Sequence, residues 1–269
     1  MSQRGGRHPT VFNLCNLPPW VIASRQFVSD PQPIEIQGVR EGNTFLFKTL
    51  DALDDPAERA RRFDDYLSVK FQLHHWQQES DLAGRSIKNS YLRFLRGWGV
   101  DSSSIEGAVL KGWVESRLGI AATYHRGKLA GSEESESDTR YAIDRMKGAA
   151  FTNAINAQLD LVYAFMQYEL ARRLPDQRWI TLWRGVNDVE DHEVIERTGK
   201  REMVVRLNNL CSFTDDQERA WEFGSTVWET QVPIPRIFFV SEFFPRSILK
   251  GEREYLVIGG ETPVRQVIT

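Results

Sequence analysis

The sequence is short of cysteine and of long apolar runs, and it carries no large excess of charge of either sign. Its two cysteines, Cys15 and Cys211, lie too far apart for a metal-binding motif and are too few for a disulfide framework. No segment approaches the roughly 18 consecutive apolar residues of a membrane-spanning helix, and no apolar segment follows the basic N-terminal residues. We therefore expect a cytoplasmic protein with no membrane span.

Charge and motif content exclude further classes of protein. The formal net charge of −3 provides no general positive field, so we expect no nucleic-acid partner. No G-x-G-x-x-G, G-x-x-x-x-G-K-[ST] or G-x-S-x-G motif is present, so the sequence indicates neither a Rossmann or P-loop nucleotide site nor a serine-hydrolase elbow. The segment HEVIE at 192–196 lacks the second histidine of a zinc-binding helix, and we expect no metal.

The first part of the chain has the pattern of helices. DDPAERARRFDDYLSVKF offers a helix start at Asp54, Asp55 and Pro56, and SSSIEGAVLKGWVESRLG offers a serine cap and a stop at Gly119. Apolar residues at helical spacing predict one long helix or two shorter helices over about 137–174. The acidic, serine-rich tract GSEESESDTR at 131–140 predicts an exposed loop.

After Pro175, short segments rich in β-branched and aromatic residues alternate with turn residues, which is typical of strands. The expected strands are RWITLWRG, REMVVRL, TVWETQV, RIFFV, EYLVI and VRQVI, and one short helix, DDQERAWEF, interrupts them. We therefore predict an α+β protein in which a mostly helical region, residues 1–175, covers a β-rich region, residues 176–269, within one integrated domain.

Two carboxylates precede the strand EYLVI, in the segment KGEREYLVIGG at 250–260. Because side chains alternate along a strand, Glu252 and Glu254 are expected to face the same side, with Cα atoms roughly 6.5–7 Å apart. That separation suits two acids on either side of a reacting sugar bond, as in inverting glycosidases. A Glu-x-Glu segment on an edge strand that only faces solvent is a common alternative, so the pair alone does not define a site.

Three elements follow one another in the β-rich region: LWRGV with Arg184 and Gly185, SFTDDQERAWEF with Ser212 and Thr214, and the Glu-x-Glu pair. This ordered set, over roughly residues 178–260, resembles the Arg–Ser–Glu class of arginine-specific mono-ADP-ribosyltransferases. Within that class, FNLCNLPPWVIASRQF, PIEIQGVR, LWRGVND and KGEREYLVIGG resemble the dinitrogenase reductase ADP-ribosyltransferases of nitrogen-fixing bacteria. One departure is Phe213 at the middle of the usual Ser-Thr-Ser.

The resemblance implies that these side chains bind NAD⁺ as co-substrate. It places Arg184 on the diphosphate and Gly185 close to the nicotinamide amide. It assigns Ser212 and Thr214 to the cleft, with Ser212 supporting the catalytic glutamate, and it puts the ring of Phe223 on the nicotinamide. Each residue also has an ordinary structural alternative: a surface arginine, a strand-end glycine, a helix-capping hydroxyl or a core aromatic.

The two glutamates receive different roles under the same resemblance. Glu254 is the expected catalytic acid, which bonds a ribose hydroxyl and stabilises the oxocarbenium-like ribose as nicotinamide leaves. Glu252 is expected to hold the guanidinium of the target arginine and to accept its proton. Phe243 and Phe244, in the preceding segment, are candidate contacts with the target or, equally, core residues.

The fold implied by the resemblance has two β-sheets with NAD⁺ in the cleft between them. The implied reaction transfers ADP-ribose from NAD⁺ to an arginine of dinitrogenase reductase, the iron protein of nitrogenase, and the family further implies control by a PII-type nitrogen-signalling protein. Two other functions stay open: an NAD⁺ glycohydrolase that uses water as the acceptor, and a non-catalytic binding module that keeps the fold.

Overall fold

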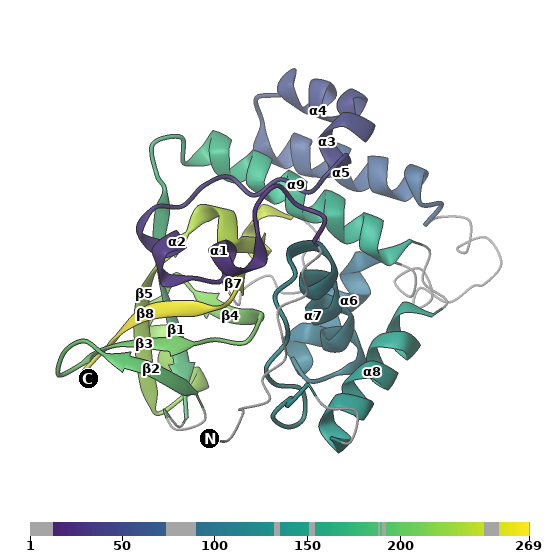
Figure 1. Ribbon diagram of the computed structural model, residues 1–269. Coiled ribbons are helices and arrows are strands. Elements are labelled where there is room, and N and C mark those ends of the chain that lie inside the picture. The colour runs from purple at the N-terminus through teal and green to yellow at the C-terminus, as the bar shows by residue number, and fades with distance from the viewer. Residues whose placement is uncertain are drawn as a thin grey trace.

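The computed structural model describes residues 13–73, 90–131, 135–150, 154–187, 189, 192–244 and 253–268. Helices dominate the described chain before residue 175 and strands dominate after it (Figure 1). The helices are α1 (Pro19–Ile22), α2 (Arg25–Ser29), α3 (Val39–Gly42), α4 (Thr44–Asp51), α5 (Pro56–Lys70), α6 (Tyr91–Val100), α7 (Ile105–Leu118), α8 (Glu136–Ala149), α9 (Ile155–Arg173) and α10 (Gln217–Ala220), with 3-10 turns η2 (Trp221–Phe223), η3 (Ile234–Arg236) and η4 (Ser241–Phe243). The strands are β1 (Trp179–Val186), β2 (Glu193–Arg197), β3 (Glu202–Arg206), β4 (Leu210–Thr214), β5 (Thr226–Pro233), β6 (Ile237–Val240), β7 (Glu254–Ile258) and β8 (Glu261–Gln266).

Local signals in the sequence set the ends of α5 and α7. The side chain of Asp55 accepts a hydrogen bond from the backbone N–H of Ala57, so α5 begins at the predicted Asp-Pro start. Ser104 caps α7, and Gly119 ends it with a φ of 72°, the left-handed conformation that favours glycine. Both helices match their predictions, because their caps depend only on neighbouring residues.

Within the acidic tract at 131–140, residues 136–140 form a helix instead of the exposed loop that the composition predicts. These residues form the first turn of α8, which Ser135 caps. Asp138 is buried there, and its carboxylate accepts hydrogen bonds from the backbone N–H groups of Ala130 and Gly131. Negative charge is favourable at a helix N-terminus, so the acids help to begin a helix. The region 137–174 accordingly divides into α8 and α9, one of the two predicted arrangements.

The described strands form one antiparallel sheet in the order β2-β3-β8-β5-β1-β4-β7-β6. The α+β prediction is confirmed. The expected pair of separate sheets differs from this arrangement, because β1 pairs with β5 on one side and with β4 on the other. The β1–β4 connection consists of a single registered pair, Trp183 with Thr214, so the sheet narrows at this junction. The HEVIE segment contains most of β2, a strand that the sequence patterns did not predict.

The long helix α9 forms the centre of the hydrophobic core. It contacts α5 on one side and β6 on the other, and in Figure 1 it crosses the molecule between α3–α5 and the sheet. Leu159, Val162, Phe165 and Met166 on this helix are fully buried. A helix with apolar residues around most of its circumference is a core helix. The helical region therefore packs onto the sheet through α9.

The N-terminal segment with α1 and α2 is fixed to the sheet region by a buried arginine. Arg236 in η3 is 1% exposed, and its guanidinium donates hydrogen bonds to the backbone oxygens of Ile22 and Ser24. The backbone N–H of Glu261 at the start of β8 donates to the oxygen of Ala23, at 2.8 Å. These bonds satisfy backbone groups that an irregular segment would otherwise leave unpaired.

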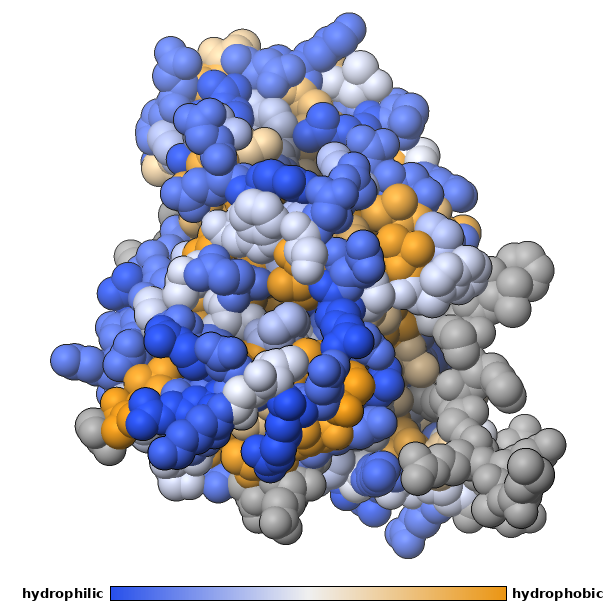
Figure 2. Space-filling model, turned by 60° about the vertical axis from the view of Figure 1, so that its left-hand side comes forward, coloured by the Kyte–Doolittle hydropathy of each residue, from blue (hydrophilic) through white to orange (hydrophobic). Residues whose placement is uncertain are grey.

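The surface is mainly hydrophilic on the face shown in Figure 2, where hydrophobic residues occupy several separate areas. Exposed large apolar side chains of the described chain include Trp20, Phe45 and Phe223, which belong to different elements. Within the described ranges, no helix combines the length and the apolar character needed to cross a bilayer.

Candidate active site

Strands β1, β4 and β7 bring the Ser-x-Thr element and the second glutamate together. Thr214 lies opposite Trp183 of β1 and opposite Glu254 of β7. Residues directly opposed in an antiparallel pair have their side chains on the same face of the sheet. Trp183, Thr214 and Glu254 therefore share one face, and Ser212, two residues along β4, lies on that face too. This face, at the narrow junction of the sheet, is the candidate active site.

Glu254 is held firmly at the beginning of β7. Its residue is 8% exposed, so the carboxylate occupies a largely desolvated position. Its backbone N–H donates a hydrogen bond to the hydroxyl oxygen of Ser241, at 3.0 Å, and Ser241 is itself fully buried. With Thr214 of β4 on the other side, the backbone of Glu254 is fixed between β4 and the turn η4, which carries Ser241. A carboxylate positioned in this way needs little rearrangement to stabilise a positive charge near it.

The first glutamate of the pair, Glu252, lies outside the described residues. The strand begins at Glu254, and the residue between the two glutamates, Arg253, has a φ of 47°. That is the left-handed region, which interrupts the pleat of a strand. Strand geometry therefore begins at Glu254, and the expectation that both glutamates lie on one face stays a prediction, because Glu252 is not among the described residues.

An ion-pair cluster holds Arg253 in this conformation. Its Nε donates to Oδ1 of Asp215 at 2.7 Å, and its Nη1 lies 3.5 Å from Oδ2 of Asp216. The hydroxyl of Tyr255 donates to the second oxygen of Asp215, at 3.3 Å. Burial and the negative charge of Asp215 raise the pKa of the Tyr255 hydroxyl above its ordinary value, so it remains a proton donor. The residues after β4 thus bind the residues at the start of β7.

The side chain of Ser212 is hydrogen-bonded to a residue of the helical region, and Ser212 is not the residue directly opposite Glu254. It lies opposite Leu256, and its Oγ accepts a hydrogen bond from Nε1 of Trp98 in α6, at 2.9 Å. The hydroxyl directly across from Glu254 belongs to Thr214, whose Oγ1 also accepts the backbone N–H of Asp216, at 3.2 Å. The register thus places the hydroxyl of Thr214, rather than that of Ser212, directly across from Glu254.

Arg184 reaches this junction from β1. It follows Trp183, so alternation turns its side chain to the other face of the strand, and its Nη1 donates to the backbone oxygen of Ser212 at 2.7 Å. Its Nε is buried and has no hydrogen-bond acceptor among the described residues. A partly buried guanidinium with an N–H group still able to donate can bind a diphosphate, because diphosphate oxygens accept charge-assisted hydrogen bonds. This chain therefore offers a fitting group for the diphosphate of NAD⁺.

Gly185 and Phe223 lie side by side at the end of β1. A Cβ added to Gly185 would be 2.2 Å from the backbone oxygen of Ala220 and 2.8 Å from the backbone nitrogen of Gly224. The glycine is thus required for α10 and η2 to pack against β1, whatever else approaches it. Phe223, at the end of η2, is 58% exposed, so its ring is available to a ligand instead of being part of the core.

The two candidate target contacts before β7 occupy different environments. Phe244 is 4% exposed, and its ring packs among other aromatic rings, with centroid distances of 5.3 to 5.9 Å to Phe63, Tyr91, Phe165 and Phe239. It is therefore a core residue in this structure. Phe243 is partly buried, and the guanidinium of Arg173 lies 3.9 Å from its ring centroid. Phe243 is the one of the two with an accessible surface.

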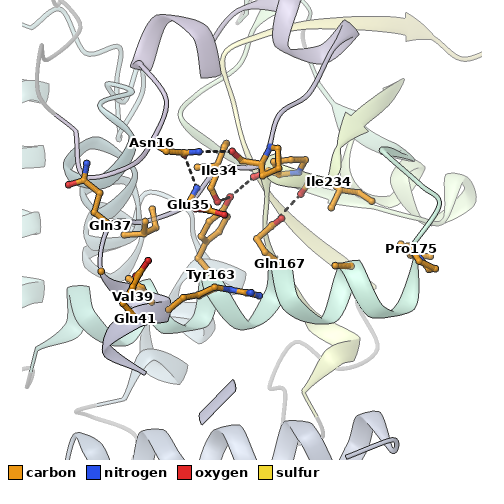
Figure 3. A pocket seen from close by; sticks show the side chains of 18 of the residues that line it. Asn16, Ile34, Glu35, Gln37, Val39, Glu41, Tyr163, Gln167, Pro175 and Ile234 are labelled. Atoms are coloured by element: carbon orange, nitrogen blue, oxygen red, sulfur yellow. Dashed lines mark hydrogen bonds between the residues drawn. The ribbon is translucent and has the colours of Figure 1, made fainter. Parts of the chain in front are cut away.

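A separate pocket of about 750 Å³ lies between the segment 33–41, α9 and η3. Figure 3 shows Glu35, Tyr163 and Gln167 around it, with Tyr163 and Gln167 bonded to backbone oxygens of its wall. Among the described candidate site residues, none lines this pocket. Within the described part of the chain, no group of three or more His, Cys, Asp or Glu side chains is arranged to hold a metal ion.

The sequence patterns did not indicate three of the residues that shape this site. Trp98 comes from a helix 114 positions before Ser212, and Ser241 lies 13 positions before Glu254. Asp215 was visible only as part of a helix start, although it also binds Arg253. These contacts depend on tertiary packing and leave no local pattern, so an ordered motif alone does not reveal them.

An arginine, a Ser-x-Thr and a glutamate on adjoining antiparallel strands are the features of the Arg–Ser–Glu class of ADP-ribosyltransferases. The chain belongs to the dinitrogenase reductase ADP-ribosyltransferase (DRAT) family, whose profile matches residues 12–266. It is 42% identical over 258 residues to the NAD(+)–dinitrogen-reductase ADP-D-ribosyltransferase of Rhodospirillum rubrum, and the match covers 94% of this chain and 93% of the relative. No solved structure matches the chain.

Proposed function

We propose that this protein transfers ADP-ribose from NAD⁺ to an arginine of dinitrogenase reductase and thereby inactivates nitrogenase. The observation that carries this proposal is membership of the family over residues 12–266, together with a relative that is named for this activity and matches almost the whole chain. A bulky dianion added to a docking surface of the target would block its electron-transfer partner by size and charge. From the sequence resemblance alone, we also propose control by a PII-type nitrogen-signalling protein.

NAD⁺ binds at the junction between the β2-β3-β8-β5-β1 part of the sheet and the β4-β7-β6 part, which act as the two sheets of this class. Support comes from the single residue pair that joins them and from the buried Nε of Arg184, which has no acceptor among the described residues. Arg184 binds the diphosphate, and the exposed ring of Phe223 covers the nicotinamide beside Gly185. Ser212 and Thr214 line the face that holds Glu254.

The co-substrate supplies the ADP-ribosyl group, with nicotinamide as the leaving group. Glu254 stabilises the positive charge that develops on the ribose, because its buried carboxylate is fixed by β4 and by Ser241. Glu252 holds the target guanidinium and accepts a proton from it, since a free arginine side chain is protonated at pH 7. Phe243 contributes to the surface that meets the target protein.

The first prediction separates the two glutamates. Glu254→Gln keeps the shape of the side chain and removes its charge, so we expect about a 100-fold or greater loss of both arginine labelling and NAD⁺ hydrolysis. Glu252→Ala should abolish labelling of dinitrogenase reductase and retain slow release of nicotinamide, because water needs no carboxylate to hold it. Nicotinamide release and protein labelling are measured side by side with purified dinitrogenase reductase.

Each outcome identifies an activity. Labelling by the parent protein at a rate that depends on the target supports the transferase. Nicotinamide release by the parent with no labelled protein would instead identify a glycohydrolase, and failure to bind NAD⁺ would identify a non-catalytic module. Loss of both activities in both variants, or full labelling by Glu252→Ala, would contradict the division of roles between the glutamates.

A further inference from the structure

Trp98 connects the helical region directly to strand β4, which carries Ser212. It lies near the end of α6, it is 3% exposed, and its Nε1 is 2.9 Å from Oγ of Ser212. An indole N–H is a donor only, so the hydroxyl oxygen of Ser212 must be the acceptor in this bond. The proton of that hydroxyl is then left for donation to another group.

The direction of that proton follows from the register of the sheet. Ser212 lies opposite Leu256, and Glu254 stands two residues before Leu256 on the same face. Such diagonal neighbours lie roughly 7–8 Å apart at Cα, within reach of a long side chain. We propose that Trp98 is a positioning residue for the transfer reaction: by occupying the acceptor side of Ser212, it directs the Ser212 hydroxyl proton toward the face that holds Glu254. This proposal rests on the proposed function.

The surroundings keep Trp98 and β4 in a fixed relation. The ammonium of Lys111 in α7 lies 5.8 Å from the centroid of the Trp98 ring. Immediately before β4, the side-chain amide of Asn209 donates to the backbone oxygens of Lys111 and Ile120, at 2.9 and 3.0 Å. The strand is therefore tied to the helical region at two points, and the helical region has a part in the chemistry beyond covering the core.

The test replaces the donor and keeps an aromatic ring. Trp98→Phe should lower kcat for ADP-ribosylation about 3- to 10-fold, the factor associated with one ordinary hydrogen bond, with KM for NAD⁺ changed less than about twofold. Trp113→Phe is the matched control, because Trp113 is also buried in the helical region and its Nε1 donates to Asp160, at 2.7 Å, away from β4. Both variants should lower Tm to a similar extent, and only Trp98→Phe should lower kcat.

A double-mutant cycle decides between positioning and general packing. If Trp98 acts through the Ser212 hydroxyl, Trp98→Phe should have little further effect on kcat in the Ser212→Ala background. Equal kcat values for Trp98→Phe and Trp113→Phe would overturn the proposal. It would also be overturned if the kcat loss of the double variant equalled the product of the losses caused by Trp98→Phe and Ser212→Ala alone. The parent enzyme is assayed in the same series, so an inactive parent would reject the proposed function, whereas an active parent with an unchanged Trp98→Phe variant would reject only this inference.

Discussion

At the scale of single residues, the site combines side chains with two kinds of constraint. Glu254 is constrained by its backbone, which β4 and Ser241 hold from either side. Arg184 is constrained through its side chain, because its Nη1 donates a hydrogen bond to the backbone oxygen of Ser212. Its Nε is buried and has no acceptor in the described chain. A fixed carboxylate and a guanidinium with spare donor capacity suit an anionic co-substrate whose sugar acquires positive charge.

The second prediction concerns Arg184. Arg184→Ala should raise KM for NAD⁺ by about tenfold or more and change kcat much less, because a diphosphate contact binds the ground state and the transition state alike. Arg265→Ala serves as the control, since Arg265 of β8 is exposed and its side chain pairs with Glu229, away from β4 and β7 in the strand order of the sheet. Steady-state kinetics with NAD⁺ as the varied substrate measure both variants. An unchanged affinity for NAD⁺ together with a lowered Tm would show that Arg184 only supports β4.

At the scale of secondary-structure elements, the sequence predicts those helix ends and strand positions that depend on residues close together in the chain. The starts of α5 and α7 and the positions of β1, β3 and β5–β8 follow from caps, turns and alternation. The helix predicted from about residue 137 matches α8, which begins at Glu136, and the loop predicted over 131–140 overlaps this start because acidic and serine residues favour both loops and helix N-termini. The left-handed conformation of Arg253 was missed because it depends on Asp215, 38 positions earlier in the chain. The order of the motifs in the sequence identifies the candidate residues, whereas the orientation of their side chains depends on tertiary packing.

The third prediction concerns the contact between β1 and η2. Gly185→Ala would place a methyl group against the backbone oxygen of Ala220, an atom that cannot move aside cheaply. We expect a loss of about 1–3 kcal/mol in the free energy of unfolding and a weaker affinity for NAD⁺, because the segment that carries Phe223 must shift. Gly199→Ala is the control, since its nearest neighbour is the flexible end of Glu202, at 3.3 Å.

Urea unfolding and NAD⁺ titration would be carried out on both glycine variants. The contact between β1 and η2 is the cause only if the Gly185 variant loses stability and the Gly199 variant does not. Equal stability of both variants would mean that α10 and η2 reposition freely, and Gly185 would then have no packing role.

At the scale of the whole molecule, the helical and β-rich regions are joined through many buried polar contacts. Arg236 binds the backbone near α1 and α2, Asn209 binds α7 and the segment after it, and Trp98 binds Ser212. Each of these bonds joins segments far apart in the chain and satisfies a buried polar group. We therefore propose that the two regions form one integrated unit, in which the change of character near residue 175 is a change of secondary structure.

A buried lysine makes this unit sensitive to pH. Lys111 is 1% exposed, and its ammonium donates to the backbone oxygen of Tyr124, at 2.9 Å. Burial lowers its pKa from 10.5 to about 8, although the negative charges of Asp101 and Glu115 act in the opposite direction. Between these two pKa values the unfolded chain binds more protons than the folded chain, so this lysine makes stability rise with pH in that window.

The last prediction uses Lys111→Met to measure this effect. Below pH 8 the parent bears the full cost of a buried charge, about 3 kcal/mol at 1.36 kcal/mol per pKa unit, and the variant bears none of it. Because the variant also loses one hydrogen bond, worth about 1 kcal/mol, we expect it to be more stable than the parent at pH 7. The advantage should fall as the pH rises to 10, since the parent lysine then loses its proton. Lys147→Met, at an exposed position of α8, should show no such change. Urea unfolding of the three proteins at both pH values is the measurement, and a difference between parent and Lys111→Met that stays constant with pH would mean that Lys111 keeps its ordinary pKa.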